Sequence, residues 1–265
     1  MRDEVYRPGP ESDLLLLWLN EALKARKKAK QECHVYDING FEMTSYSQQN
    51  EDVGIIKDFM PKIDQVRDGT FVELGGYNGI TYSNTKGIED TFGFKGVLIE
   101  PSDAFVAMDI NRLNTQNFRA AISTEAEVQF IGSDAIAGTL KNLTQNATDG
   151  VPITSLLGAS YKKTDPTPYT VKGRPISSIL QESELKYIDL FFIDVEGSEL
   201  DVIKTMDWSI PVYIICIEMH DNSSRHKEQE EIRKILKERG FSYKKKIYHD
   251  EVWVNDSYFR KDKFV

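Results

Sequence analysis

From residue 70 onward, short runs of β-branched and aromatic residues alternate with stretches of helical character. Strands alternating with helices predict an α/β fold with a mostly parallel sheet and right-handed crossovers. The five main runs lie at 70–74, 96–100, 118–122, 188–194 and 211–219. The last two are almost continuously apolar, which is typical of strands covered on both faces.

Two further features complete the predicted sheet. The run at 128–131 is expected to add a strand beside the third one. The segments 241–248 and 251–254 are expected to form a hairpin that closes the sheet with an antiparallel edge. Before them, a polar helix is expected from about residue 227 to 239.

Near the start of the chain, Ser12 is placed to cap a helix that runs to about residue 30. Its leucines form one stripe: Leu15, Leu16, Leu19 and Leu23. Such a stripe usually packs on the protein body. The alternative is a partner or dimerisation helix, through which the chain would form a homo-oligomer.

The domain organisation follows from these patterns. Residues 1–45 are expected to be an N-terminal extension with an amphipathic helix, and 46–265 one domain. Residues 132–173 are rich in Gly, Ser, Thr, Asn and Pro and show little periodicity. A loop of that length in a compact domain is often functional, so this segment is predicted to be an acceptor-side loop or lid.

Charge and cysteine content narrow the class of protein. The chain carries 33 basic and 42 acidic residues, a net charge of −9, whereas nucleic-acid binders usually show a basic excess. No apolar run approaches the roughly 18 residues of a membrane span. Two cysteines, Cys33 and Cys216, allow at most one disulfide, so a reducing, cytoplasmic location is expected.

The segment F-V-E-L-G-G-Y-N-G-I-T (71–81) carries the first chemical signal. A strand containing Glu73 leads into a turn with Gly75, Gly76 and Gly79, and a helix is expected to follow. Glycines there let backbone N–H groups and the helix N-terminus approach a ligand. A glycine turn alone equally indicates a tight strand-to-helix connection.

The next strand ends in Glu100, a carboxylate placed to accept both hydroxyls of a ribose at the carboxyl edge of the sheet. Glu73 and Glu100 at the ends of successive strands therefore predict a nucleoside site. An acid at the first position would repel a pyrophosphate and suits a positively charged amino-acid moiety. S-adenosylmethionine is favoured over NAD for this reason.

Two later strands also end in ionisable residues. Asp194 and Glu196 lie at the end of a buried strand, just before Gly197. The segment E-M-H-D (218–221) lies at the end of the following strand. Acids at this edge are costly to bury without a cation or hydrogen-bond partner. His220, after a strand-end acid and opposite the D-x-E turn, is a candidate general base.

In this order, the motifs resemble the FkbM-type family of S-adenosylmethionine-dependent methyltransferases. They are Y-S-Q-Q-N-E-D (46–52), the glycine turn with S-N-T (83–85), G-V-L-I-E-P (96–101), A-A-I-S (120–123), I-D-V-E-G-S-E (193–199) and I-E-M-H (217–220). The resemblance implies a seven-stranded class I methyltransferase sheet of Rossmann-like type. Tyr77 departs from the alternating glycines of the general methyltransferase turn.

The resemblance also implies roles for individual residues. The cofactor-binding set is Gln48, Glu73, Gly75, Gly76, Gly79, Asn84, Glu100, Pro101, Ala121, Ile122 and Asp194. Within it, Glu73, Gly75 and Gly79 would hold the methionine part, with Gln48 and Asn84 assisting. Glu100 would take the ribose hydroxyls, and Ala121 and Ile122 would lie near the adenine.

The implied reaction is methyl transfer to a hydroxyl of a sugar, a glycan or another natural product. His220 or Asp194 would take the proton, and Glu196 would hold the acceptor or orient the base. A divalent cation on Asp194, Glu196 and Asp221 is a less favoured arrangement. Two alternatives stay open: an RNA ribose 2′-O-methyltransferase, and a non-catalytic binding module that retains the fold.

Overall fold

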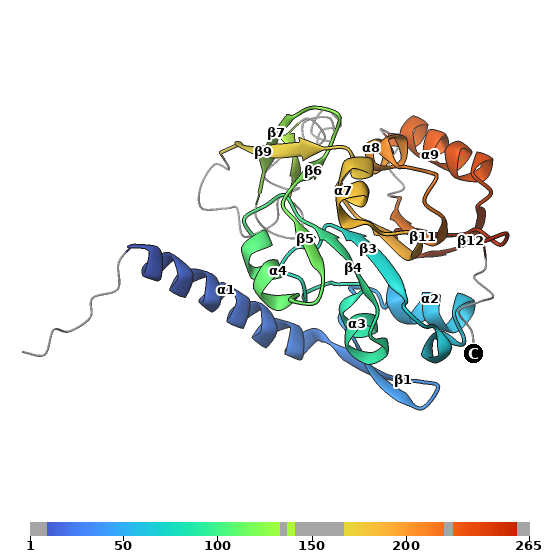
Figure 1. Cartoon of the computed structure of the whole chain (residues 1–265), viewed down its shortest axis with the longest axis horizontal. Coiled ribbons are helices and arrows are strands. Elements are labelled where there is room, and N and C mark those ends of the chain that lie inside the picture. The colour runs from blue at the N-terminus through green and yellow to red at the C-terminus, as the bar shows by residue number, and fades with distance from the viewer. Residues whose placement is uncertain (1–9, 133–136, 141–166, 220–224, 259–265) are drawn as a thin grey trace, which may run out of the picture.

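The computed structural model describes residues 10–132, 137–140, 167–219 and 225–258 (Figure 1). The helices are α1 (Pro10–Glu32), α2 (Glu51–Phe59), α3 (Lys86–Phe92), α4 (Phe105–Asn111), α7 (Ile176–Ser183), α8 (Glu199–Thr205) and α9 (His226–Glu238), with a 3-10 turn, η1 (Ile63–Gln65). The strands of the large sheet are β3 (Thr70–Leu74), β4 (Lys95–Ile99), β5 (Gln116–Phe118), β10 (Ile188–Ile193), β11 (Val212–Glu218), β12 (Ser242–Ile247) and β13 (Asp250–Val254).

The large sheet has seven strands in the order β12-β13-β11-β10-β3-β4-β5. The strands β11, β10, β3, β4 and β5 pair in parallel, whereas β13 is antiparallel to both of its neighbours. The predicted α/β class, the mostly parallel sheet and the closing hairpin are therefore confirmed. β3 lies near the centre, so its carboxyl end meets those of β4 and β10.

Helices cover both faces of this sheet. On one face, α7, α8 and α9 pack over Val72, Leu74, Ile193 and their neighbours. On the other, α2, α3 and α4 pack over Phe71, Leu190 and Phe192. Successive side chains of a strand point to opposite faces, so the buried strands β3 and β10 contribute to both cores and need apolar residues at nearly every position.

A second, smaller sheet lies beside the first (Figure 1). Its strands, in spatial order, are β6 (Ala121–Ile122), β9 (Tyr169–Arg174), β7 (Glu127–Ile131) and β8 (Gly138–Thr139). β6 pairs in parallel with β9, and β7 pairs with β9 in the antiparallel direction.

This small sheet corrects three predictions. The run 118–122 is not one strand, because the chain leaves the large sheet after Phe118 and β6 pairs with β9 instead. The strand at 128–131 does not lie beside it, since β9 stands between them. The predicted loop 132–173 ends in a strand, where Gly173 is required because a Cβ there would meet the Glu125 carbonyl oxygen at 2.0 Å.

For residues 1–45 the sequence predicted only a helix, which is α1. A hairpin of β1 (His34–Ile38) and β2 (Phe41–Ser45) follows it, and the buried Met43 belongs to the core under α3. The C-terminal half of α1 packs on α4 through small residues and through Arg26, whose Nε donates to Asn111 Oδ1 at 2.7 Å. The extension is thus joined to the body by apolar and polar contacts.

Two further findings concern compartment and membrane. Cys33 and Cys216 are both free thiols. None of the helices in the described part of the chain combines the length and apolar character that crossing a bilayer requires.

Because the central strands are buried on both faces, truncating one of their side chains should lower the free energy of unfolding strongly. Leu190→Ala removes a fully buried side chain of β10, and we expect the free energy of unfolding to fall by about 2–5 kcal/mol. Val35→Ala, at an exposed apolar position on β1, is the matched control and should change it by less than about 0.5 kcal/mol. Urea unfolding measures both; equal effects would contradict this account of the core.

Candidate active site

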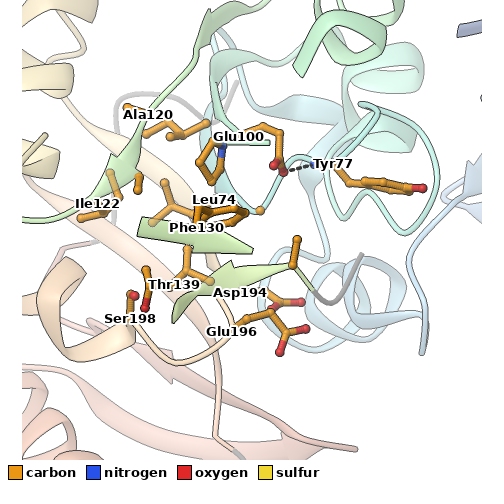
Figure 2. A pocket seen from close by; sticks show the side chains of 16 residues that line it. Leu74, Tyr77, Glu100, Ala120, Ile122, Phe130, Thr139, Asp194, Glu196 and Ser198 are labelled. Atoms are coloured by element: carbon orange, nitrogen blue, oxygen red, sulfur yellow. Dashed lines mark hydrogen bonds between the residues drawn. The ribbon is translucent and has the colours of Figure 1, made fainter. Parts of the chain in front are cut away.

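A pocket opens at the carboxyl edge of the large sheet, where Glu100, Asp194 and Glu196 lie (Figure 2). It holds about 600 Å³ of empty space, which includes the solvent at its mouth. The residues that line it are Leu74, Gly75, Tyr77, Ile99, Glu100, Pro101, Ala120, Ala121, Ile122, Phe130, Ala137, Thr139, Asp194, Val195, Glu196 and Ser198. They come from the ends of β3, β4 and β10 and from the small sheet.

The glycine turn after β3 passes very close to the end of β10. Gly75 has a φ of 77°, and a Cβ on it would lie 2.1 Å from the Asp194 carbonyl oxygen. The N–H groups of Gly75 and Gly76 both donate to the Ile99 carbonyl at 3.1 Å. The turn therefore bridges the ends of β4 and β10, and only glycine fits at position 75.

The expectation that a helix begins at this turn was wrong. Residues 75–85 are irregular, and α3 begins only at Lys86. Asn78 Oδ1 accepts the N–H groups of Ile80 and Thr81, and Tyr82 has a positive φ of 62°. An Asn side chain that takes local N–H groups competes with helix formation, so no helix N-terminus points into the pocket from this turn.

Glu100 lies at the pocket wall with both carboxylate oxygens oriented by backbone donors. Tyr77 N–H donates to Oε2 and Ser102 N–H to Oε1, each at 2.8 Å. Figure 2 shows the first of these bonds, with the Tyr77 ring pointing away from Glu100. Burial raises the pKa of Glu100 above its ordinary value, although these hydrogen bonds and Arg119 favour the charged form. The Ser102 hydroxyl is a third donor to Glu100, and since a carboxylate has about four acceptor positions, one remains for a ligand.

The wall opposite the acids is apolar. Ala121 and Ile122 line it together with Phe130 and Leu74, and Figure 2 shows the last three of these side chains. Phe130 belongs to β7, and its ring stacks edge-on against Tyr169 at 5.8 Å between centroids. Phe130 and Thr139 were not predicted as site residues, because no local sequence pattern shows that β7 and β8 fold back over the large sheet.

Asp194 and Glu196 meet at the other end of the pocket, among further carboxyl groups. Asp194 shares a carboxyl–carboxyl hydrogen bond with Glu218, which requires a proton between them. Burial, then Glu218, Asp250 and Glu199, raise the pKa of Asp194 well above its ordinary value. Burial, then Asp194 and Glu199, raise the pKa of Glu196 to about 8. Burial and mutual repulsion therefore both favour the protonated forms of these carboxyl groups.

The loop that carries these acids is shaped by Glu199. Its Oε1 accepts the N–H groups of Gly197 at 2.9 Å and Val195 at 3.3 Å, and its Oε2 lies 3.7 Å from the Arg225 guanidinium. Glu196 and Gly197 both have positive φ, 50° and 103°. A Cβ on Gly197 would collide with Arg225 at 1.8 Å. The loop is thus held in one conformation by Glu199 and Arg225, neither of which was predicted.

The same region carries the sequence match. Residues 73–243 match the family described as the methyltransferase FkbM domain, which is well over half of the chain. The chain belongs to the FkbM methyltransferase family. No curated protein matches it in sequence. Among solved structures, the mitomycin 7-O-methyltransferase MmcR aligns over 89% of this chain and 67% of its own, at 8% identity and a TM-score of 0.31.

Glu73, predicted to hold the methionine part in this FkbM domain, does not line the pocket. Its Oε1 accepts the Asn84 N–H at 2.7 Å, and its Oε2 accepts the hydroxyls of Ser83, at 3.0 Å, and Thr85. The fully buried Arg112 lies 3.7 Å away and forms a 2.5 Å ion pair with Glu89. Glu73 points to the face of the sheet covered by α3 and α4, and its oxygens have partners inside the protein.

The remaining predicted cofactor residues divide between the pocket and its surroundings. Pro101 lines the pocket, whereas Gly76 and Gly79 pack against Met108 and Arg112 behind it. Gln48 lines a different cavity with Tyr46 and Tyr82. Asn84 lies beside Glu73, and its buried Oδ1 has no hydrogen-bond partner among the described residues.

Three predictions concern residues outside the described ranges. His220 and Asp221 lie there, so the structure does not test the base at 220 or the cation alternative that uses 221. Within the described ranges, no three His, Cys, Asp or Glu side chains are arranged to hold a metal ion. Most of the predicted lid, 132–173, also lies outside them; in its described part, the Tyr169 hydroxyl donates to the Gly132 carbonyl at 2.6 Å.

The buried cluster around Arg112 predicts a strong effect of neutralising its cation. Arg112→Met leaves the carboxylates of Glu73 and Glu89 buried without their counter-charge, and we expect a loss of about 3–5 kcal/mol in unfolding free energy. Arg119→Met, which breaks an exposed pair with Asp103, should cost about 1 kcal/mol or less. Chemical denaturation compares the two, and a small effect at Arg112 would show that its ion pairs are dispensable.

Proposed function

We propose that this FkbM-family protein is an S-adenosylmethionine-dependent O-methyltransferase whose acceptor is a hydroxyl of a sugar or glycan. One observation carries the proposal: Glu100 and the Asp194–Glu196 turn lie at two ends of one pocket, with an apolar wall between them. That order matches a ligand with a ribose, a flat base and a positive charge. A class I, Rossmann-like methyltransferase fold is part of the proposal.

The residues present fit the nucleoside part of this cofactor. Glu100 keeps acceptor capacity for a ribose hydroxyl, because the Tyr77 N–H and the N–H and hydroxyl of Ser102 use three of its about four acceptor positions. Ala121, Ile122 and Phe130 offer an apolar slot to the adenine. Gly75 and Pro101 let the backbone approach the ligand from the other side.

The residues also fit the charged part. The pKa values of Asp194 and Glu196 are raised, and a sulfonium beside them would stabilise their ionised forms. We assign Glu73, Asn84 and Arg112 a positioning role instead, since they fix residues 79–85 from behind. We assign Gln48 a positioning role as well, because it follows Ser47, which pairs with Tyr82 through a β-bridge.

The bound cofactor supplies a methyl group on a positively charged sulfur, already activated for transfer. The main task of the protein is then to align the acceptor oxygen with the methyl carbon and the sulfur. As the new C–O bond forms and the C–S bond breaks, the hydroxyl proton passes to a base. We assign that role to His220 or Asp194, with Glu196 holding the acceptor or orienting the base. Asp194 can act only after it has lost the proton that it shares with Glu218.

The proposal extends to the organisation of the chain. Residues 46–265 would form the catalytic domain and 1–45 an extension, with 132–173 as the acceptor-side lid. The two free thiols are consistent with a reducing, cytoplasmic setting.

The decisive experiment follows label from S-adenosylmethionine labelled in its methyl group into a panel of glycans, nucleotide sugars and RNA. We expect transfer to a carbohydrate, and Glu100→Gln should weaken cofactor binding about 10- to 100-fold, the value of one or two charge-assisted hydrogen bonds. Glu182→Gln, which changes a surface carboxylate paired with Arg174, is the matched control. Label on RNA alone would replace the acceptor class, and no cofactor binding by calorimetry would reject the enzyme.

The raised pKa of Glu196 predicts a pH-dependent cofactor affinity. Below about pH 8 the group is protonated, and a bound sulfonium favours its ionised form. Affinity for S-adenosylmethionine should therefore rise with pH up to about 8 and then level off, with protons released on binding at neutral pH. S-adenosylhomocysteine lacks the sulfonium charge and should show a much weaker dependence. Calorimetry in buffers of different ionisation enthalpy measures both, and equal pH profiles would place the sulfonium elsewhere.

A further inference from the structure

Side-chain hydrogen bonds connect the N-terminal helix to the glycine turn (residues 75–79) at the pocket. The second half of α1 passes alongside α4 (Figure 1). There, Arg26 donates from Nε to Asn111 Oδ1 at 2.7 Å and from Nη2 to the Ile110 carbonyl at 3.5 Å. Asn111, the last residue of α4, is 7% exposed, and its Nδ2 donates to the Asn78 carbonyl at 2.9 Å. One amide side chain therefore joins α1 to the glycine turn.

The two partners of Asn111 fix the orientation of its amide. A guanidinium can only donate hydrogen bonds, and a backbone carbonyl can only accept them. The side-chain oxygen of Asn111 must therefore face Arg26, and its NH2 group must face the Asn78 carbonyl. Without the arginine, the amide loses the contact that selects this orientation, and its bond to the turn is weakened.

The glycine turn needs such external contacts because its own conformation is strained. The Gly79 N–H donates to the Gly76 carbonyl at 2.8 Å and closes a four-residue turn. Tyr77 occupies the second position with a φ of 45°, a conformation that favours Gly, Asn or Asp. A bulky residue keeps this conformation only when its surroundings hold it. The end of α4 supplies two such contacts, from Asn111 and from Arg112, which donates to the Gly79 carbonyl at 3.2 Å.

The conformation of this turn determines how Glu100 meets a ligand. The N–H group of the strained residue, Tyr77, donates to Glu100 Oε2 at 2.8 Å and orients that carboxylate oxygen. The hydrogen bond across the turn makes residues 76–79 one unit. A rotation that moves the Asn78 carbonyl therefore also moves the Tyr77 N–H. The contact between α1 and α4 acts in this way on the wall of the pocket.

We propose that Arg26 and Asn111 are positioning residues for the cofactor, through which the N-terminal extension holds the turn that orients Glu100. The inference rests on the proposed binding of S-adenosylmethionine. Arg26 does not line the pocket, so its effect passes through Asn111 and the turn. A second contact of α1 lies just beyond the turn, where Lys28 Nζ is 5.4 Å from the centre of the Tyr82 ring.

Calorimetry with S-adenosylmethionine on the full chain tests the role of the arginine. We expect Arg26→Met to raise the cofactor Kd about 3- to 10-fold, the net value of one hydrogen bond. Arg26→Lys, whose ammonium group can still donate to Asn111, should restore most of the affinity. Lys24→Met is the matched control, because Lys24 is an exposed cation of α1 that pairs with Glu21 of the same helix. Equal Kd values for Arg26→Met and Lys24→Met overturn the proposal.

A substitution of the amide separates docking of the helix from control of the turn. Asn111→Asp keeps an acceptor for Arg26 and strengthens their pairing by adding a negative charge. It also replaces the donor that faces the Asn78 carbonyl with an oxygen, and two oxygens repel each other there. If Asn111 only docked α1, this variant would bind the cofactor as the wild type does. We expect instead that its Kd rises about tenfold or more, and wild-type affinity would overturn the proposal.

Amide hydrogen exchange of the ligand-free protein measures the turn directly. In Arg26→Met the Tyr77 and Gly79 amides should exchange about 3- to 10-fold faster, whereas the amides of the core strand β10 should keep their wild-type rates. A wild type that does not bind S-adenosylmethionine rejects the proposed function, and the exchange rates then decide whether α1 holds the turn. A wild type that binds, with Arg26→Met unchanged in both measurements, rejects this inference alone.

Discussion

The carboxyl edge of the large sheet depends on one close contact, where the turn after β3 passes the end of β10. A Cβ on Gly75 would meet the Asp194 carbonyl oxygen at 2.1 Å, so the two loops approach as closely as backbone atoms allow. The same turn donates two hydrogen bonds to the Ile99 carbonyl, and the Tyr77 N–H binds Glu100. One short segment thereby sets the spacing between the two ends of the pocket.

The sheet also separates two groups of buried charges. On the α3–α4 face, Arg112 pairs with both Glu73 and Glu89, and hydroxyl and N–H donors also bind Glu73. At the pocket, Asp194 shares a proton with Glu218, and Glu199 takes part of the charge of Arg225. Buried charges are tolerated when they are paired. The first group is complete without a ligand, whereas the second keeps protons that a cation would displace.

The sequence predicted the strands and the sheet edge because both depend on local patterns. Apolar runs identified β3, β4, β10 and β11, and parallel pairing brought their ends to one rim. The face of the sheet on which Glu73 lies was not predicted. Side chains alternate between the two faces of a strand, so Glu73 lies on the face opposite to Val72 and Leu74. Glu100, by contrast, follows the end of its strand. The small sheet, and with it Phe130, depends on pairing between residues about 40 positions apart, which no local pattern reveals.

The pairing of β7 with β9 has a consequence for the variation of this fold. Phe130 and Tyr169 are directly opposite each other, so the two ends of the segment between them are held side by side. Lengthening a segment with anchored ends costs little, about 0.6 kcal/mol for each doubling. The length of the chain between β8 and β9 can therefore vary among relatives at little cost, while Phe130, Ala137 and Thr139 keep their places in the wall of the pocket.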